Sequence, residues 1–339
     1  MAKLLEGRVA VVTGAGRGLG RAHALLMASL GASVVVNDLG GAVDGTGAAA
    51  SPADAVVAEV TRSGGKAVAN YDSVATPGGA DNIIKTAMDS FGRLDILVNN
   101  AGILRDRMVF NMTDEEWDLV LKVHLYGTFY CTRAASRLMR AQRYGRIINT
   151  SSISGMGNMG QANYSAAKEG IVGFTRTAAR DLGRYGVTCN AIRPGAATRM
   201  TLTEELYAAR KRAWGAEAAD EWRRTLEARA PQDVAPLVAF LASEGAGNIN
   251  GCVFEVRGNF IGIYADPPRL YGTLVKKEGR WLPGELAQIV PQTLASGLKE
   301  LPSGAEMLLS PDARGWEWSQ GKLRETGPSI PEGLAPAGG

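Results

Sequence analysis

Histidine and cysteine are scarce in this sequence. Its 339 residues include two histidines, His23 and His124, and three cysteines, Cys131, Cys189 and Cys252. An odd number of widely spaced cysteines favours neither a disulfide framework nor a metal cluster. Two histidines leave little material for a histidine-rich metal site or for a Ser-His-Asp triad. We therefore expect no bound metal, and the cysteine usage indicates a reducing, cytoplasmic setting.

Long apolar runs and an excess of charge of one sign are also missing. No stretch approaches the roughly 18–20 apolar residues that cross a bilayer, and residues 1–6 lack the apolar core of a secretory signal. The net charge is only +3, whereas a nucleic-acid partner usually requires clustered basic residues. These features predict a cytoplasmic protein with neither a nucleic-acid nor a membrane partner.

Short β-branched runs alternate with helix-length segments through most of the chain. Runs such as Val34-Val35-Val36 are continuously apolar, as parallel strands covered on both faces require. The alternation predicts an α/β fold with a single doubly wound, Rossmann-type parallel sheet and helices on both faces. Ligands of such sheets bind at the carboxyl ends of the strands. The predicted strands are 8–13, 33–38, 67–71, 94–99, 146–151, 187–193 and 252–256.

Some segments do not follow the alternation. Residues 40–51 predict a Gly/Ala-rich loop, and residues 201–230 predict a charged helical insertion. Beyond about residue 262 proline and glycine become frequent, and 283–298 is the one stretch there that favours a helix. We expect a catalytic domain over 1–262 and a C-terminal extension over 263–339, serving as a cap or a subunit-contact arm with its last ~12 residues disordered.

A glycine-rich segment, Thr13 to Gly20, follows the first predicted strand and opens a helix. Glycines permit a tight turn and allow backbone N–H groups to approach a pyrophosphate at a helix N-terminus, where the helix dipole favours negative charge. A glycine turn without a ligand is the alternative interpretation. The dinucleotide site predicted from this segment includes Gly14, Arg17, Gly18, Leu19 and Gly20.

Asp38 ends the second predicted strand, 24 residues after Gly14. A carboxylate there can accept hydrogen bonds from the adenosine ribose and repels a 2′-phosphate, which favours NAD over NADP. Arg17 favours NADP instead, since a basic residue in the glycine turn could reach the 2′-phosphate. We give Asp38 more weight because one exposed arginine hardly cancels a repulsive carboxylate. The alternative interpretation of Asp38 is that it only caps the end of the strand.

Tyr164 and Lys168 lie four residues apart on a predicted helix, so they share one face. A phenol with an ordinary pKa of about 10 is a poor base at neutral pH, and we expect the neighbouring ammonium to lower that pKa. A tyrosine tuned in this way can exchange a proton with an alcohol or a ketone. A serine hydroxyl nearby can hold the substrate oxygen. Alone, the spacing is more typical of a solvated helix face.

These segments, taken in order, resemble the short-chain dehydrogenase/reductase family over roughly residues 5–262. The resemblance implies that Tyr164 transfers the proton and that Lys168 assists it. The family's serine usually lies 13 residues before the tyrosine, which corresponds to Ser151, with Ser152 as the fallback. The further cofactor contacts that it implies are Asp72, Ser73, Asn99, Ala101, Gly102, Tyr164, Lys168, Pro194, Gly195 and Thr198.

The sequence departs from the family pattern at His124, where an asparagine is common. In the family the asparagine acts partly through its backbone carbonyl, and histidine can supply that carbonyl too. The His124 side chain could also join a proton relay, because its charge changes near neutral pH. Packing alone is the alternative. His124 is a feature of a subgroup that this chain resembles, the dehydrogenase domains of peroxisomal multifunctional enzymes type 2, which oxidise (3R)-hydroxyacyl-CoA and hydroxysteroids with NAD.

The leading functional hypothesis is therefore NAD-dependent interconversion of a secondary alcohol and a ketone, on a 3-hydroxyacyl thioester or a hydroxysteroid-like alcohol. An NADPH-dependent 3-oxoacyl carrier-protein reductase shares every one of these motifs and is the second hypothesis. A non-catalytic dinucleotide-binding protein is the third, although both Tyr164 and Lys168 are present. The family resemblance also implies a homotetramer or a homodimer.

Overall fold

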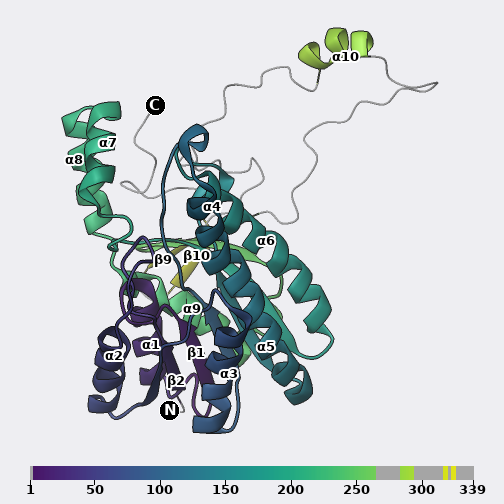
Figure 1. Cartoon of the computed structure of the whole chain (residues 1–339). Helices are drawn as coiled ribbons and strands as arrows, with labels where there is room; N and C mark the ends of the chain where they lie inside the picture. The colour runs from purple at the N-terminus through teal and green to yellow at the C-terminus, as the bar shows by residue number, and fades with distance from the viewer. Residues whose placement is uncertain (1–2, 265–282, 294–315, 320–321, 326–339) are drawn as a thin grey trace.

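One mostly parallel sheet organises the molecule (Figure 1). The computed structural model describes residues 3–264, 283–293, 316–319 and 322–325. The sheet has eight strands in the order β3-β2-β1-β4-β5-β6-β7-β8, all parallel except for the β7–β8 pair. Its strands are β1 Val9–Thr13, β2 Ser33–Asn37, β3 Lys66–Asn70, β4 Ile96–Asn99, β5 Gly145–Thr150, β6 Val187–Gly195, β7 Val253–Arg257 and β8 Phe260–Ile263.

Helices cover both faces of the sheet, so the predicted doubly wound α/β fold is confirmed. Alternate residues of a strand face opposite sides, and β1 shows this clearly. Ala10 and Val12 join the core under α1, α2 and α9, whereas Val9 and Val11 join the core under α3, α5 and α6. These helices are α1 Gly18–Ser29, α2 Ser51–Arg62, α3 Pro77–Phe91, α4 Asp114–Leu121, α5 Gly127–Gln142, α6 Ala162–Gly183 and α9 Ala235–Leu241.

Sequence reasoning placed all seven parallel strands within a few residues and missed β8. This strand is short, contains Gly262, and returns antiparallel along β7, pairing Phe254 with Ile263. A four-residue segment without an apolar alternation carries little strand signal. The expected end of the catalytic domain at residue 262 therefore falls inside the last strand of the sheet.

The predicted insertion at 201–230 forms two helices, α7 Glu204–Trp214 and α8 Ala216–Glu227, which stand beyond one end of the sheet (Figure 1). The helix expected over 283–298 is shorter: α10 covers Pro283–Ile289 and is followed by a 3-10 turn, Val290–Gln292. A separate hairpin pairs β9 Trp316–Ser319 with β10 Lys322–Glu325. The last ~12 residues, expected to be disordered, lie outside the described residues.

The connection from α4 to α5 is a π-helical turn, Lys122–Tyr126, which makes the two helices continuous. Thr113 begins α4 with a capping box, in which its hydroxyl accepts from the N–H of Glu116 and the Glu116 carboxylate accepts from the N–H of Thr113. A π-helical turn changes the direction of the side chains within it, and this one carries His124.

Candidate active site

The carboxyl ends of the parallel strands meet at a cavity of about 380 Å³. It lies beside the crossing from β1 to β4, where the strand order reverses and where ligands of doubly wound sheets bind. Gly20, Asn99 and Gly195 do not line it. The predicted site residues that do line it are Gly14, Arg17, Gly18, Leu19, Asp38, Asp72, Ser73, Ala101, Gly102, His124, Ser151, Tyr164, Lys168, Pro194 and Thr198.

The glycine turn wraps around the end of β1. Gly14 has a φ of +63°, in the left-handed region that favours glycine, and a Cβ on it would lie 2.8 Å from the Ala101 Cα. Gly20 lies deeper, where a Cβ would meet the Gly14 carbonyl oxygen at 2.2 Å. Gly20 therefore lets α1 pack closely against the turn and is a positioning residue. Gly18 and Leu19, in the first turn of α1, line the cavity, so the helix N-terminus lies beside it, which suits an anionic group.

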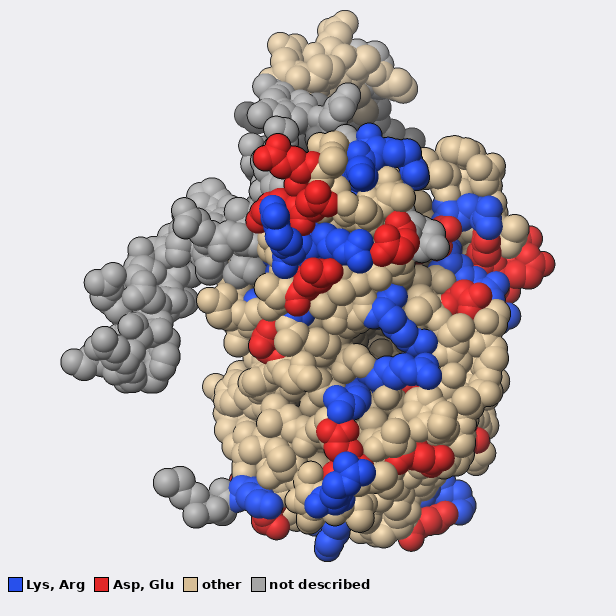
Figure 2. All heavy atoms as spheres, turned by 90° about the vertical axis from the view of Figure 1, so that its left-hand side faces the viewer, with Lys and Arg blue, Asp and Glu red and all other residues tan. Residues whose placement is uncertain are grey.

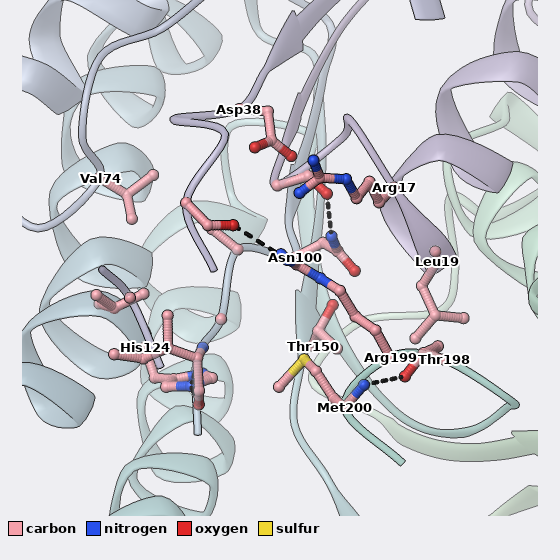
Figure 3. Close-up of a pocket in the computed structure, with 18 of the residues that line it drawn as sticks. Arg17, Leu19, Asp38, Val74, Asn100, His124, Thr150, Thr198, Arg199 and Met200 are labelled. Carbon is pink, nitrogen blue, oxygen red and sulfur yellow. Dashed lines mark hydrogen bonds between the residues drawn. The ribbon is translucent and has the colours of Figure 1, made fainter. Parts of the chain in front are cut away.

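Asp38 follows β2 and faces the glycine turn (Figure 3). One carboxylate oxygen accepts a hydrogen bond of 2.7 Å from the Gly16 N–H, and the other accepts one of 2.7 Å from the Gly40 N–H. Two backbone donors thus fix the carboxylate at the edge of the cavity. Each oxygen keeps a second lone pair with which it can accept from a ribose hydroxyl. The residues present fit the adenosine half of a dinucleotide.

The Asn99–Asn100 pair braces the site from β4. The Asn99 side-chain amide donates to Asn149 on β5, at 2.9 Å, and is buried away from the cavity. The Asn100 amide donates to the carbonyl oxygens of Thr13 and Gly14, at 2.9 and 3.1 Å. These hydrogen bonds tie the end of β4 to β5 and to the end of β1. Asn100, not Asn99, borders the cavity.

Tyr164 and Lys168 both project into the cavity from the first turns of α6. The Lys168 Nζ lies 5.4 Å from the centroid of the Tyr164 ring and donates a hydrogen bond of 2.6 Å to the Thr150 carbonyl oxygen at the end of β5. The Lys168 side chain is otherwise buried. An ammonium has three donors, so two remain for groups in the cavity.

Desolvation controls the ionisation of this pair. It raises the pKa of Tyr164 to about 12, against a smaller lowering by the Ser152 hydroxyl. It also lowers the pKa of Lys168 to about 7. The expectation that the ammonium lowers the tyrosine pKa is wrong for this structure, because burial raises that pKa and the Ser152 hydroxyl, not Lys168, is the group that lowers it. At neutral pH Tyr164 is a phenol that can donate a proton.

The two adjacent serines point in different directions. The Ser151 hydroxyl is buried and donates to the backbone carbonyl oxygen of Lys168, at 2.8 Å. The Ser152 hydroxyl faces the phenol of Tyr164 and favours its ionised form. Successive residues of an extended chain place their side chains on opposite sides, and Ser152 is extended, with φ −160° and ψ 155°. Both residues border the cavity.

His124 packs edge-on against the Tyr164 ring, with centroids 5.1 Å apart and ring planes at 85°. Its Nε2 lies 3.0 Å from the Ile103 N and 2.8 Å from the Ile103 O, and its buried Nδ1 has no hydrogen-bond partner among the described residues. Burial, and secondarily the charge of Lys168, hold the pKa of His124 well below its usual range. The imidazole is therefore neutral at pH 7, and a relay that needs its charge to change near neutrality does not fit.

The remaining predicted contacts lie around the rim. The Asp72 carboxylate accepts from Asn70 at 2.8 Å, and the Thr198 hydroxyl accepts from the Met200 N–H at 3.2 Å. Sequence reasoning missed several lining residues because they carry no motif of their own. Arg199 and Thr150 were recognisable only by their positions beside predicted residues. The missed lining residues include Asn37, Leu39, Val74, Asn100, Ile103, Thr150, Arg199, Met200 and Thr201.

The described parts of the chain carry neither a metal-binding cluster nor a membrane-spanning helix. No group of three or more His, Cys, Asp or Glu side chains there is arranged to hold a metal ion. Over the same residues, none of the helices combines the length and the apolar character needed to cross a bilayer.

Comparison with known proteins identifies the family. The model of the short chain dehydrogenases matches residues 8–210. Peroxisomal multifunctional enzyme type 2 from Mus musculus is 49% identical over 81% of this chain and 35% of its own length. A hydroxyacyl-CoA dehydrogenase of Mycobacterium tuberculosis is 45% identical over 83% of this chain and 87% of its own length. The chain belongs to the short-chain dehydrogenase family, as the sequence predicted.

Two further likenesses bear on the fold and the substrate. A 3-oxoacyl-acyl-carrier-protein reductase of Synechocystis is 45% identical over 76% of this chain and 98% of its own length. A crystal structure of a short chain dehydrogenase from Mycobacterium avium matches with a TM-score of 0.73 and 42% identity, covering 88% of this chain and 98% of that one. The chain spans about a third of the length of its multifunctional relatives: 35% of the Mus musculus enzyme and 32% of a peroxisomal hydratase-dehydrogenase-epimerase from Neurospora crassa.

Proposed function

We propose that this protein is an NAD-dependent oxidoreductase that interconverts a secondary alcohol and a ketone, with a 3-hydroxyacyl thioester as substrate. The observation that carries the proposal is the position of the Tyr164 phenol. It shares one cavity with a buried lysine, a serine hydroxyl, the glycine turn and Asp38. The similarity to a hydroxyacyl-CoA dehydrogenase supports the substrate class.

Tyr164 exchanges the proton in this proposal. In the reducing direction its hydroxyl donates to the carbonyl oxygen of the ketone, and in the oxidising direction its phenolate accepts the proton of the alcohol. The bound nicotinamide supplies or accepts the hydride. A phenol whose pKa is raised to about 12 holds its proton at neutral pH. At neutral pH it is therefore ready to donate, whereas oxidation depends on the small fraction of phenolate.

Ser152, rather than Ser151, holds the substrate oxygen, because its hydroxyl faces Tyr164 while that of Ser151 is committed to the Lys168 backbone. A donor placed beside the phenol can stabilise the charge that develops on the oxygen. Lys168, with Nζ held on the Thr150 carbonyl, offers its remaining donors to the tyrosine side of the cavity and to the nicotinamide ribose. Neutral His124 packs edge-on against the Tyr164 ring and helps to keep it in place.

Asp38 and the glycine turn set the cofactor. The Asp38 carboxylate, fixed by the Gly16 and Gly40 N–H groups, accepts from ribose hydroxyls and repels a 2′-phosphate, so NAD is preferred. Asp72, Ser73, Pro194 and Thr198 border the same cavity and complete the contacts to the adenine and nicotinamide ends.

The test is an activity screen that follows the absorbance of the reduced cofactor. Purified protein is supplied with 3-hydroxyacyl-CoA thioesters, hydroxysteroids and simple secondary alcohols, each with NAD and with NADP. We expect NAD reduction with the thioesters at the highest kcat/KM. Absence of turnover with every alcohol and both cofactors would contradict the proposal.

A second candidate function is reduction of a 3-oxoacyl group on a carrier protein with NADPH. The similarity to a reductase of that name supports it. The same screen, run in reverse with 3-oxoacyl thioesters, separates the two. A preference for NADPH over NADH would support the reductase and contradict our interpretation of Asp38.

A further inference from the structure

Arg199 crosses the mouth of the cavity. It follows β6, and its guanidinium donates a hydrogen bond of 3.1 Å to the Gly41 carbonyl oxygen, in the loop after β2 (Figure 3). Within the described residues this is its single hydrogen bond, and it forms no ion pair there. A long, exposed arginine that is held by one neutral carbonyl leaves most of its donors available.

The segment that carries Arg199 lies directly over the glycine turn. A Cβ added to Gly18, the first residue of α1, would lie 3.6 Å from the Thr198 Cγ2. The N-terminus of α1 and the Thr198–Met200 segment therefore face each other across a gap at the mouth of the cavity. A pyrophosphate lying on the helix N-terminus would pass beneath the Arg199 side chain.

Around this gap, positively charged side chains outnumber negatively charged ones. Arg17 and Arg199 repel one another, and the Asp38 carboxylate is the acidic group that attracts Arg199. Partial burial and this repulsion lower the pKa of Arg199. On the face shown in Figure 2, lysine and arginine side chains gather at the rim of a hollow. An anion entering the gap relieves the repulsion between the two guanidinium groups.

We propose that Arg199 is a phosphate-binding latch for the dinucleotide. Its guanidinium binds the pyrophosphate from the side opposite the glycine turn, and it joins the segment after β6 to the loop after β2 across the bound cofactor. Arginine suits this role because its planar donors match phosphate oxygens in pairs. The inference rests on the dinucleotide part of the proposed function and is independent of which alcohol is the substrate.

The test compares Arg199→Gln with Arg21→Gln. Arg21 lies on α1, forms an ion pair with Glu59 and is not among the residues that line the cavity, so its replacement removes the same charge from the same region. Dissociation constants are measured by calorimetry for NADH, ADP and adenosine at several salt concentrations. Circular dichroism checks that each variant is folded, and Arg199→Lys tests whether charge alone suffices.

We expect Arg199→Gln to weaken NADH and ADP binding by about 10- to 100-fold, the range for a hydrogen bond to a charged group. Adenosine, which has no phosphate, should bind within twofold of the wild-type value, and Arg21→Gln should change nothing by more than twofold. Arg199→Lys should recover part of the loss. NADH affinity within twofold of wild type in Arg199→Gln, or an equal loss for adenosine and ADP, would contradict the proposed role of Arg199. Wild-type protein that bound no NADH would instead overturn the cofactor assignment itself.

Discussion

Burial has opposite effects on the two ionisable groups that carry the proposed chemistry. It keeps the proton on Tyr164 by raising its pKa to about 12 and weakens the charge on Lys168 by lowering its pKa to about 7. Each effect disfavours the charged form in a poorly solvated cavity. The pair is therefore neutral or singly charged near pH 7. A substrate oxygen that develops negative charge would favour the ammonium form of Lys168 and keep the proton on Tyr164 until it is transferred.

This ionisation predicts a difference between the two reaction directions. Reduction needs the Tyr164 proton, which is present throughout the neutral range, whereas oxidation needs the phenolate, which becomes more abundant as the pH rises toward about 12. From about pH 8 to about pH 10, above the pKa of about 7 that burial gives Lys168, kcat/KM for oxidation should rise continuously and kcat/KM for reduction should stay nearly level. Steady-state rates in both directions measure this. An oxidation profile that falls with increasing pH would contradict the assignment.

The two serines should respond differently to replacement by alanine. Ser152→Ala should lower kcat about 100-fold, since it removes a donor beside the reacting oxygen. Ser151→Ala should leave kcat nearly unchanged and lower the free energy of unfolding by about 1 kcal/mol, the usual value of one hydrogen bond. Steady-state kinetics and denaturant unfolding of both variants decide the matter. The reverse ranking of the two kcat values would show that Ser151 holds the substrate.

At the scale of elements, the π-helical turn between α4 and α5 and the loop after β4 fix the position of His124. A Cβ on Gly102 would lie 2.4 Å from the His124 Cε1, which is closer than nonbonded carbon atoms approach. His124 is buried, and its ring supports Tyr164, so it has little room to move. The close contact of the loop with the π-helical turn therefore orients the phenol.

We predict that Gly102→Ala lowers the free energy of unfolding by about 1–3 kcal/mol through overpacking and reduces kcat by displacing the Tyr164 ring. Gly173→Ala is the matched control, because it lies within α6 and a Cβ there would meet nothing within 4 Å. The control should be neutral or stabilising by up to about 1 kcal/mol. Chemical denaturation and kinetics of both proteins provide the comparison. Equal stability and equal kcat in the two variants would contradict the role given to this contact.

For the molecule as a whole, the sequence predicts the architecture and most of the site because strand ends in a parallel sheet place motifs distant in sequence at one edge. Gly14, Asp38 and Tyr164 illustrate this, since each follows or faces such an end. The orientation of Ser152 depends on side-chain direction in a single extended residue, which spacing in the sequence does not specify. Arg199 reaches the site through its length, and the pKa of Tyr164 depends on its burial. Both are properties of the folded chain.

Cofactor binding should also be visible in the stability of the whole molecule. At a concentration about 100 times its dissociation constant, a ligand of the folded state stabilises it by about 2.7 kcal/mol, which corresponds to roughly 5–10 °C in Tm for a domain of this size. NAD should produce this shift, and NADP at the same concentration a smaller one, because Asp38 repels the 2′-phosphate. Differential scanning fluorimetry measures both. A larger shift with NADP would contradict the cofactor preference, and Asp38→Ala should narrow the gap.

In the proposed reaction Tyr164 exchanges the proton while the rest of the cavity binds the cofactor and the substrate. The most direct measurement compares wild type with Tyr164→Phe, using NADH titration for binding and absorbance of the reduced cofactor for turnover. We expect an NADH affinity within about twofold of wild type and a loss of kcat of about 10² to 10⁴, the usual contribution of a general acid or base. Undiminished turnover in Tyr164→Phe would contradict it.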